Sequence, residues 1–322
     1  MKSIAVFDRR GKRAPGVWPF YNYLRYEFNM FFVEDLDMPA ERPLHASMQY
    51  LPEGIDYILW GFMPGTALDL SRDYLNRSGI PIIVSIGDVW QFLDRPGVSQ
   101  QFWGLENIKH LIYKQRDTGI PDPHLERLEA LTRTGFKAVG NTKDRYGTGP
   151  ETFLSNATIL KSPWGIDPDK YQPVDHDDKT LDVTHICTIS NDIHHHTRKE
   201  QRSAVSELSP FTRNVYARAY HDILHRTKML IVDNSGSGLT TQKYVEGAIH
   251  GCLLMGEQPY LDPDVFNDDT MCICQPGELP DLVRYYLANP GERIEKANRL
   301  KERVINNYHL EDSIRPILEA LK

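Results

Sequence analysis

The densest group of residues that could do chemistry lies in the segment DNSGSGLTTQKYVEG, residues 233–247. A loop of small residues follows Asp233 and ends at Gly238, and such a loop lets backbone approach a ligand closely. Thr240 and Thr241 come next, where a helix should begin, with hydroxyls and free backbone N–H groups. A helix start of this kind binds anions, and a diphosphate would suit it.

Two charged residues follow on the expected helix. Lys243 lies in the first turn, where the helix dipole disfavours a cation unless an anion compensates it. Glu246 is one turn further along, and its spacing allows two interpretations. It could form an ordinary i, i+3 ion pair with Lys243, or its carboxylate could accept hydrogen bonds from two vicinal hydroxyls of a ribose. The segment is not the G-x-G-x-x-G motif of dinucleotide-binding folds.

The elements that must position these residues are short apolar runs alternating with amphipathic stretches. Runs such as 3–8 and 80–88 indicate strands buried in a parallel sheet, and the alternation predicts βαβ units. The pattern breaks at the Pro- and Asp-rich stretch 164–180 and then restarts. We therefore expect an α/β protein with two Rossmann-like domains facing across a cleft. The expected parts are an N-terminal domain 1–165, a linker 166–180, a C-terminal domain 181–308 and a C-terminal helix 309–322 that packs back on the N-terminal domain.

Composition excludes several classes of protein. The 322 residues are 40% hydrophobic and 25% charged, as in a globular chain rather than a disordered or fibrous one. No apolar run approaches the ~18–20 residues of a membrane span, and the N-terminus lacks a secretory signal, so we expect a cytoplasmic protein. The net charge of −7 disfavours general coating of nucleic acid. The four cysteines lack zinc-site spacing and are expected to be buried reduced thiols.

Three separated motifs resemble GT-B glycosyltransferases of the group 1-like kind. Residues 243–260 and 278–314 are similar to the C-terminal domain of these enzymes, and residues 162–173 are similar to their interdomain linker. The motifs occur in the family's order. The resemblance implies the GT-B architecture and a nucleotide-sugar donor bound mainly by the C-terminal domain.

The resemblance also implies which residues meet the donor. Glu246 matches the glutamate that holds the nucleotide ribose, and the basic residues match those that neutralise the leaving diphosphate. Many retaining members carry another glutamate eight positions before Glu246, where this chain has Gly238, which implies a divergent branch. The expected donor-binding residues are Ser190, Asn191, Arg198, Lys199, Gly238, Thr240, Thr241, Lys243 and Glu246.

The N-terminal half should supply the acceptor side. Asp88 closes an apolar run and could be a helix N-cap or turn residue, or a general base or ligand of the acceptor hydroxyl. The loop 8–16 could be an ordinary solvated basic loop, or it could contact an anionic acceptor such as a phosphorylated lipid, an acidic glycan or nucleic acid. Its basic residues are Arg9, Arg10, Lys12 and Arg13.

No metal site and no cofactor are expected. The run His194–His196 is consecutive, so its side chains point in different directions, and the D-x-D matches lie in turns. The predicted activity is metal-independent transfer of a sugar from a UDP- or GDP-sugar to a hydroxyl of a glycan, lipid or other acceptor. The alternatives are nucleotide-sugar epimerisation, a non-catalytic nucleotide-sugar binding module, and a DNA-modifying glycosyltransferase, which the net charge disfavours.

Overall fold

The computed structural model describes residues 1–7, 24, 26–32, 53–61, 72–86, 93, 105–134, 157–167, 173–187, 196–208, 218–234 and 237–322. The chain divides into two compact units. The first is made of residues 1–114, 121–163 and 314–322, and the second of residues 115–120 and 164–313.

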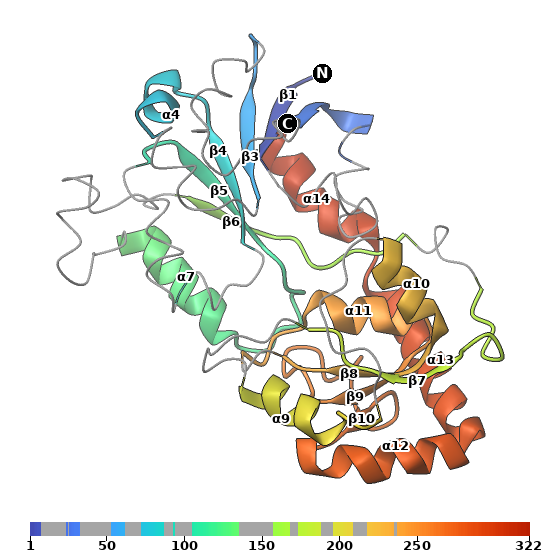
Figure 1. Cartoon of the computed structure of the whole chain (residues 1–322). Helices are drawn as coiled ribbons and strands as arrows, with labels where there is room; N and C mark the ends of the chain where they lie inside the picture. The colour runs from blue at the N-terminus through green and yellow to red at the C-terminus, as the bar shows by residue number, and fades with distance from the viewer. Residues whose placement is uncertain are drawn as a thin grey trace. The chain divides into compact units, whose positions relative to one another are not determined.

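The first unit contains a six-stranded parallel sheet with the order β2-β1-β3-β4-β5-β6 (Figure 1). Its strands are β1 Ser3–Phe7, β2 Asn29–Phe32, β3 Tyr57–Trp60, β4 Ile82–Ile86, β5 Ile108–Tyr113 and β6 Thr158–Lys161. Two of its helices are α4 Arg72–Ser78 and α7 Pro123–Thr134. The sequence analysis missed β5, because Lys109 and His110 interrupt its apolar residues; Lys109 is exposed while Ile108 and Leu111 are buried.

The second unit contains a four-stranded parallel sheet with the order β10-β9-β8-β7. Its strands are β7 Leu181–Thr184, β8 Thr227–Val232, β9 Leu253–Gly256 and β10 Cys272–Ile273. The helices are α9 His196–Ala204, α10 Arg218–Arg226, α11 Gln242–Ile249, the 3-10 turn η5 Pro276–Glu278, α12 Leu279–Ala288, α13 Pro290–Asn307 and α14 Leu310–Leu321, whose last residues belong to the first unit.

The second sheet is covered on both faces, which explains its continuous apolar strands (Figure 1). Leu230 and Val232 of β8 pack with α10, α11 and α13 in one core cluster. Met229 and Ile231 pack with α12 and the end of α9 in the other. Because side chains alternate along a strand, this parity directs Asp233, the next odd-numbered residue, toward the α9 side.

The first strand of this sheet lies earlier than the sequence analysis expected. We predicted a strand at 184–190, but β7 ends at Thr184 and pairs with β8 through Leu181, Val183 and Thr184. Asp182 is exposed and broke the apolar pattern used to find the strand. The expectation for the cysteines is confirmed: Cys187, Cys252, Cys272 and Cys274 are buried free thiols.

Candidate functional site

The carboxyl end of β8 carries a buried carboxylate, Asp233, which is 1% exposed. Arg198 of α9 donates from Nε to Asp233 Oδ1 at 2.7 Å, and Lys243 Nζ of α11 lies 3.6 Å from Oδ2. Burial alone would raise the pKa of Asp233, but Lys243 and Arg198 more than offset it and lower the pKa to about 2. Asp233 is therefore ionised at neutral pH and brings cations from two helices to one edge of the sheet.

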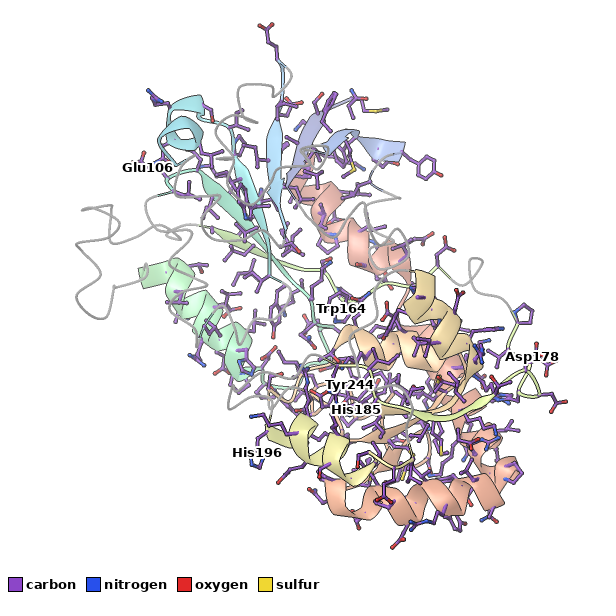
Figure 2. All side chains as sticks on the ribbon, viewed as in Figure 1. Glu106, Trp164, Asp178, His185, His196 and Tyr244 are labelled. Atoms are coloured by element: carbon purple, nitrogen blue, oxygen red, sulfur yellow. The ribbon has the colours of Figure 1, made fainter. Side chains whose placement is uncertain are left out.

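His185 and Arg202 extend this arrangement. His185 directly follows β7 and is fully buried (Figure 2). Its Nε2 lies 3.2 Å from Cys187 Sγ, and Arg202 Nη2 lies 3.9 Å from the same sulfur. Burial, followed by the field of Lys243, lowers the pKa of His185 to about 3, so the ring is neutral. We call Arg198, Arg202 and Lys243 the cationic cluster.

The cationic cluster carries more positive charge than the neighbouring carboxylates balance. Asp233 is one such carboxylate, and Glu257, just after β9, is held by hydrogen bonds from α9 and from the loop after β8. Within the described part of the chain, Lys243 Nζ and Arg202 Nε are buried and have no hydrogen-bond partner. Because buried charges require compensation, this excess favours an anionic ligand.

The N-terminus of α11 adds to this positive field. Thr241 is the N-cap residue, with an extended backbone at φ −87° and ψ 160°, but its side chain makes no capping hydrogen bond. Its Oγ1 is buried without a partner among the described residues. The first turn contains no acidic residue, and it does contain Lys243. An anion placed here would meet free N–H groups and the positive end of the helix dipole, typically worth about 0.3–2 kcal/mol.

Thr240 serves the fold of the loop. Its N–H donates to Gln115 Oε1 at 3.2 Å, and its carbonyl accepts from Gln115 Nε2 at 3.1 Å and Trp164 Nε1 at 3.0 Å. Its hydroxyl donates to the Asp262 carboxylate, which also pairs with Arg116 at 2.8 Å. These contacts fix the loop before α11, and the predicted contact of Thr240 with the donor stays a prediction.

Glu246 lies one turn beyond Lys243 on α11 and is 6% exposed. Its Oε1 accepts from Gln242 Nε2 at 2.6 Å, and its carboxyl also hydrogen-bonds the Tyr220 hydroxyl. Burial raises the pKa of Glu246 to about 8. Of the two interpretations of its spacing, the i, i+3 ion pair is not the arrangement found, because Lys243 pairs with Asp233 instead.

Gly238 has a backbone conformation that explains why no side chain stands there. Its φ is +74°, and an added Cβ would lie 2.1 Å from Cδ1 of Tyr260. The Tyr260 N–H donates to the Gly238 carbonyl at 2.9 Å, which keeps the ring against the loop. A glutamate at this position would require both a strained backbone and a displaced tyrosine.

The structure brings together only some of the predicted donor residues. Arg198, Thr241 and Lys243 lie at the same edge of the second sheet, whereas Lys199 is exposed on α9. Sequence reasoning missed the role of Asp233 and all of His185 and Arg202. The position of Arg202, one turn after Arg198 on the same helix face, was a usable signal. The predicted residues outside the described ranges are Arg9, Arg10, Lys12, Arg13, Asp88, Ser190 and Asn191.

Two searches of the described residues returned nothing. No group of three or more His, Cys, Asp or Glu among them is placed to hold a metal ion. None of the helices in this part of the chain combines the length and apolar character that a bilayer crossing requires.

Comparisons with known proteins agree with this architecture. Residues 193–319 match the family described as glycosyl transferase-like. HepE from Anabaena, solved in complex with UDP-glucose, has a TM-score of 0.61 at 12% identity, over 100% of this chain and 99% of that one. Sucrose-phosphate synthase from Thermosynechococcus elongatus has a TM-score of 0.55 at 10% identity, over 99% and 98%. No curated protein matches the sequence. The chain is thus an α/β protein with two parallel sheets and the GT-B glycosyltransferase fold, and its resemblance to group 1-like glycosyltransferases is confirmed.

Proposed function

We propose that this protein transfers a sugar from a nucleoside-diphosphate sugar to an acceptor hydroxyl, without an obligatory metal. The observation that carries the proposal is the surplus of buried positive charge at the N-terminus of α11, on the helix that also bears Glu246. Arg198 and Lys243 would bind the diphosphate, with Arg202 close behind them, and the free N–H groups of α11 would meet its oxygens. Glu246 would accept hydrogen bonds from the ribose hydroxyls.

The same groups suit the chemical step. When the bond between the sugar and the diphosphate breaks, negative charge accumulates on the departing phosphate oxygens. Arg198 and Lys243 are held in place by Asp233 before the reaction, so they can stabilise this charge without reorganising. Fixed side-chain cations would thus do what a divalent ion does in metal-dependent transferases.

The acceptor side of the proposal rests on the sequence. Asp88 is proposed as the general base for the acceptor hydroxyl. Arg9, Arg10, Lys12 and Arg13 are proposed to contact an anionic acceptor.

A thermal-shift panel tests the donor site. We expect one of UDP, GDP, ADP, CMP and dTDP to raise the melting temperature of the wild type, with or without EDTA. A ligand at 100 times its Kd adds about 2.7 kcal/mol of stability, enough for a clear shift. The shift should shrink in Glu246→Ala and Lys243→Met but not in Arg284→Ala, whose guanidinium makes an exposed ion pair with Asp281. Absence of a shift with every nucleotide would contradict the proposal.

A non-catalytic nucleotide-sugar binding module is the second candidate. The observation that favours it is the Tyr260 ring, which fills the space beside Gly238 where many relatives carry a glutamate. Donor hydrolysis separates the two functions. An enzyme should release free sugar slowly from the nucleotide sugar that it binds, whereas a binding module should hold the donor without turnover.

A further inference from the structure

Glu246 is held by a tyrosine from another helix. Tyr220 lies near the start of α10, is 8% exposed, and shares a core cluster with α11. Its hydroxyl hydrogen-bonds the Glu246 carboxyl. From the other side, Gln242 donates its Nε2 to Glu246 Oε1 at 2.6 Å. Two neutral donors on two helices therefore restrict the orientation of this carboxyl.

Few charged or titratable groups act on the pair. Lys243, on the same helix as Glu246, contributes its field while its ammonium group lies beside Asp233. The Cys252 thiol faces Tyr220, and burial raises its pKa to about 11, so it is neutral. Burial raises the pKa of Glu246, and the hydrogen bond from Tyr220 is the foremost of the effects that lower it. The Tyr220 hydroxyl therefore favours the ionised carboxylate as well as fixing its direction.

We propose that Tyr220 is a positioning residue that aims the Glu246 carboxylate at the vicinal hydroxyls of the ribose, so that the site selects a ribonucleotide over a 2′-deoxyribonucleotide. This inference rests on the proposed function, in which Glu246 meets the ribose. A carboxylate in a fixed orientation can accept from both hydroxyls of a ribose, whereas a 2′-deoxyribose offers only one. The selectivity depends on the Tyr220 hydroxyl and not on its ring.

Calorimetric titration of the wild type and Tyr220→Phe tests this role. The probes are UDP, GDP and ADP with their 2′-deoxy counterparts, at pH 7 and pH 9. Each pair shares one diphosphate, so the ratio of the two Kd values is insensitive to phosphate ionisation. The wild type should favour the ribonucleotide about tenfold or more, since hydrogen bonds to charged groups are strong. In Tyr220→Phe this preference should fall to about twofold at pH 7 and partly return at pH 9, with the deoxynucleotide affinity unchanged.

Tyr244→Phe is the matched control. Tyr244 is buried on α11 next to Lys243, but its hydroxyl donates to the Glu257 carbonyl at 2.6 Å and not to Glu246. It removes the same atom from the same core, so it should leave the ribose preference intact. Gln242→Ala is a second variant that keeps the test open if Tyr220→Phe does not fold, and it should also lower the preference.

The outcomes separate the two proposals. If no nucleotide binds the wild type, the proposed function fails and this inference fails with it. If nucleotides bind but the wild type shows no preference for ribose, only this inference fails. An unchanged preference in Tyr220→Phe, or an equal loss in Tyr244→Phe, would likewise overturn the positioning role of Tyr220.

Discussion

Two buried carboxylates in the second unit have opposite ionisation behaviour, and their neighbours explain why. Asp233 lies beside Arg198 and Lys243, and its pKa falls to about 2. For Glu246 burial dominates over the hydrogen bonds from Tyr220 and Gln242, and the pKa rises to about 8. Asp233 therefore contributes stability above its unfolded pKa of about 3.8 and loses it as the pH falls toward 2. Glu246 behaves in the reverse sense.

The folded state favours the protonated form of Glu246, so its contribution to stability is present below the unfolded pKa of 4.5 and is lost as the pH rises through 8. Glu246→Gln keeps the size and cannot ionise. We expect this variant to be more stable than the wild type at pH 8 by about 2 kcal/mol or more, and the difference to vanish near pH 4. Urea denaturation at pH 4, 6 and 8 measures it.

Glu295→Gln is the control for that series, because Glu295 is exposed and pairs only with Arg299 among the contacts described. It should follow the wild type at every pH. A Glu246→Gln variant that is less stable than the wild type at pH 8 would mean that the ionised carboxylate is stabilised in the fold.

At the scale of elements, the turn between β8 and α11 decides where the helix N-terminus points. Thr240 ties this turn to Gln115, Trp164 and Asp262, and Gly238 lets it pass beneath the Tyr260 ring. The strand, the small-residue loop and the helix could be predicted from the sequence, because each has a local signature. The anchor at Gln115 lies 125 residues away in the sequence, so no local pattern could indicate it.

Gly238→Ala tests the packing of this turn. Gly119 has the same φ of +74° in the same unit, but open space around it. Alanine at either position pays the backbone strain, and only at Gly238 must the Tyr260 ring also move. We expect Gly238→Ala to lower the free energy of unfolding by about 1–3 kcal/mol more than Gly119→Ala. Adding Tyr260→Ala to Gly238→Ala should remove that excess; equal costs in the two single variants would contradict this packing.

For the molecule as a whole, the sequence predicted the architecture better than the site. Alternating apolar runs predicted two parallel sheets, and the motifs between residues 160 and 315 predicted the GT-B fold. β5 was missed because of its polar residues Lys109 and His110. The site was predicted in part: Lys243 and Arg198 belong to it by spacing and resemblance. Asp233, which joins them, required the parity of β8 and the position of α9 to be known.

The most direct test of the central claim is a titration with inorganic pyrophosphate at low ionic strength, because this probe needs no knowledge of the base or the sugar. The account predicts that the wild type and Arg284→Ala bind pyrophosphate equally. It predicts that Arg198→Ala and Lys243→Met each bind it about tenfold more weakly, since each removes a charge-assisted contact. Equal binding by all four proteins, or no binding by the wild type, would contradict an anion site at the N-terminus of α11.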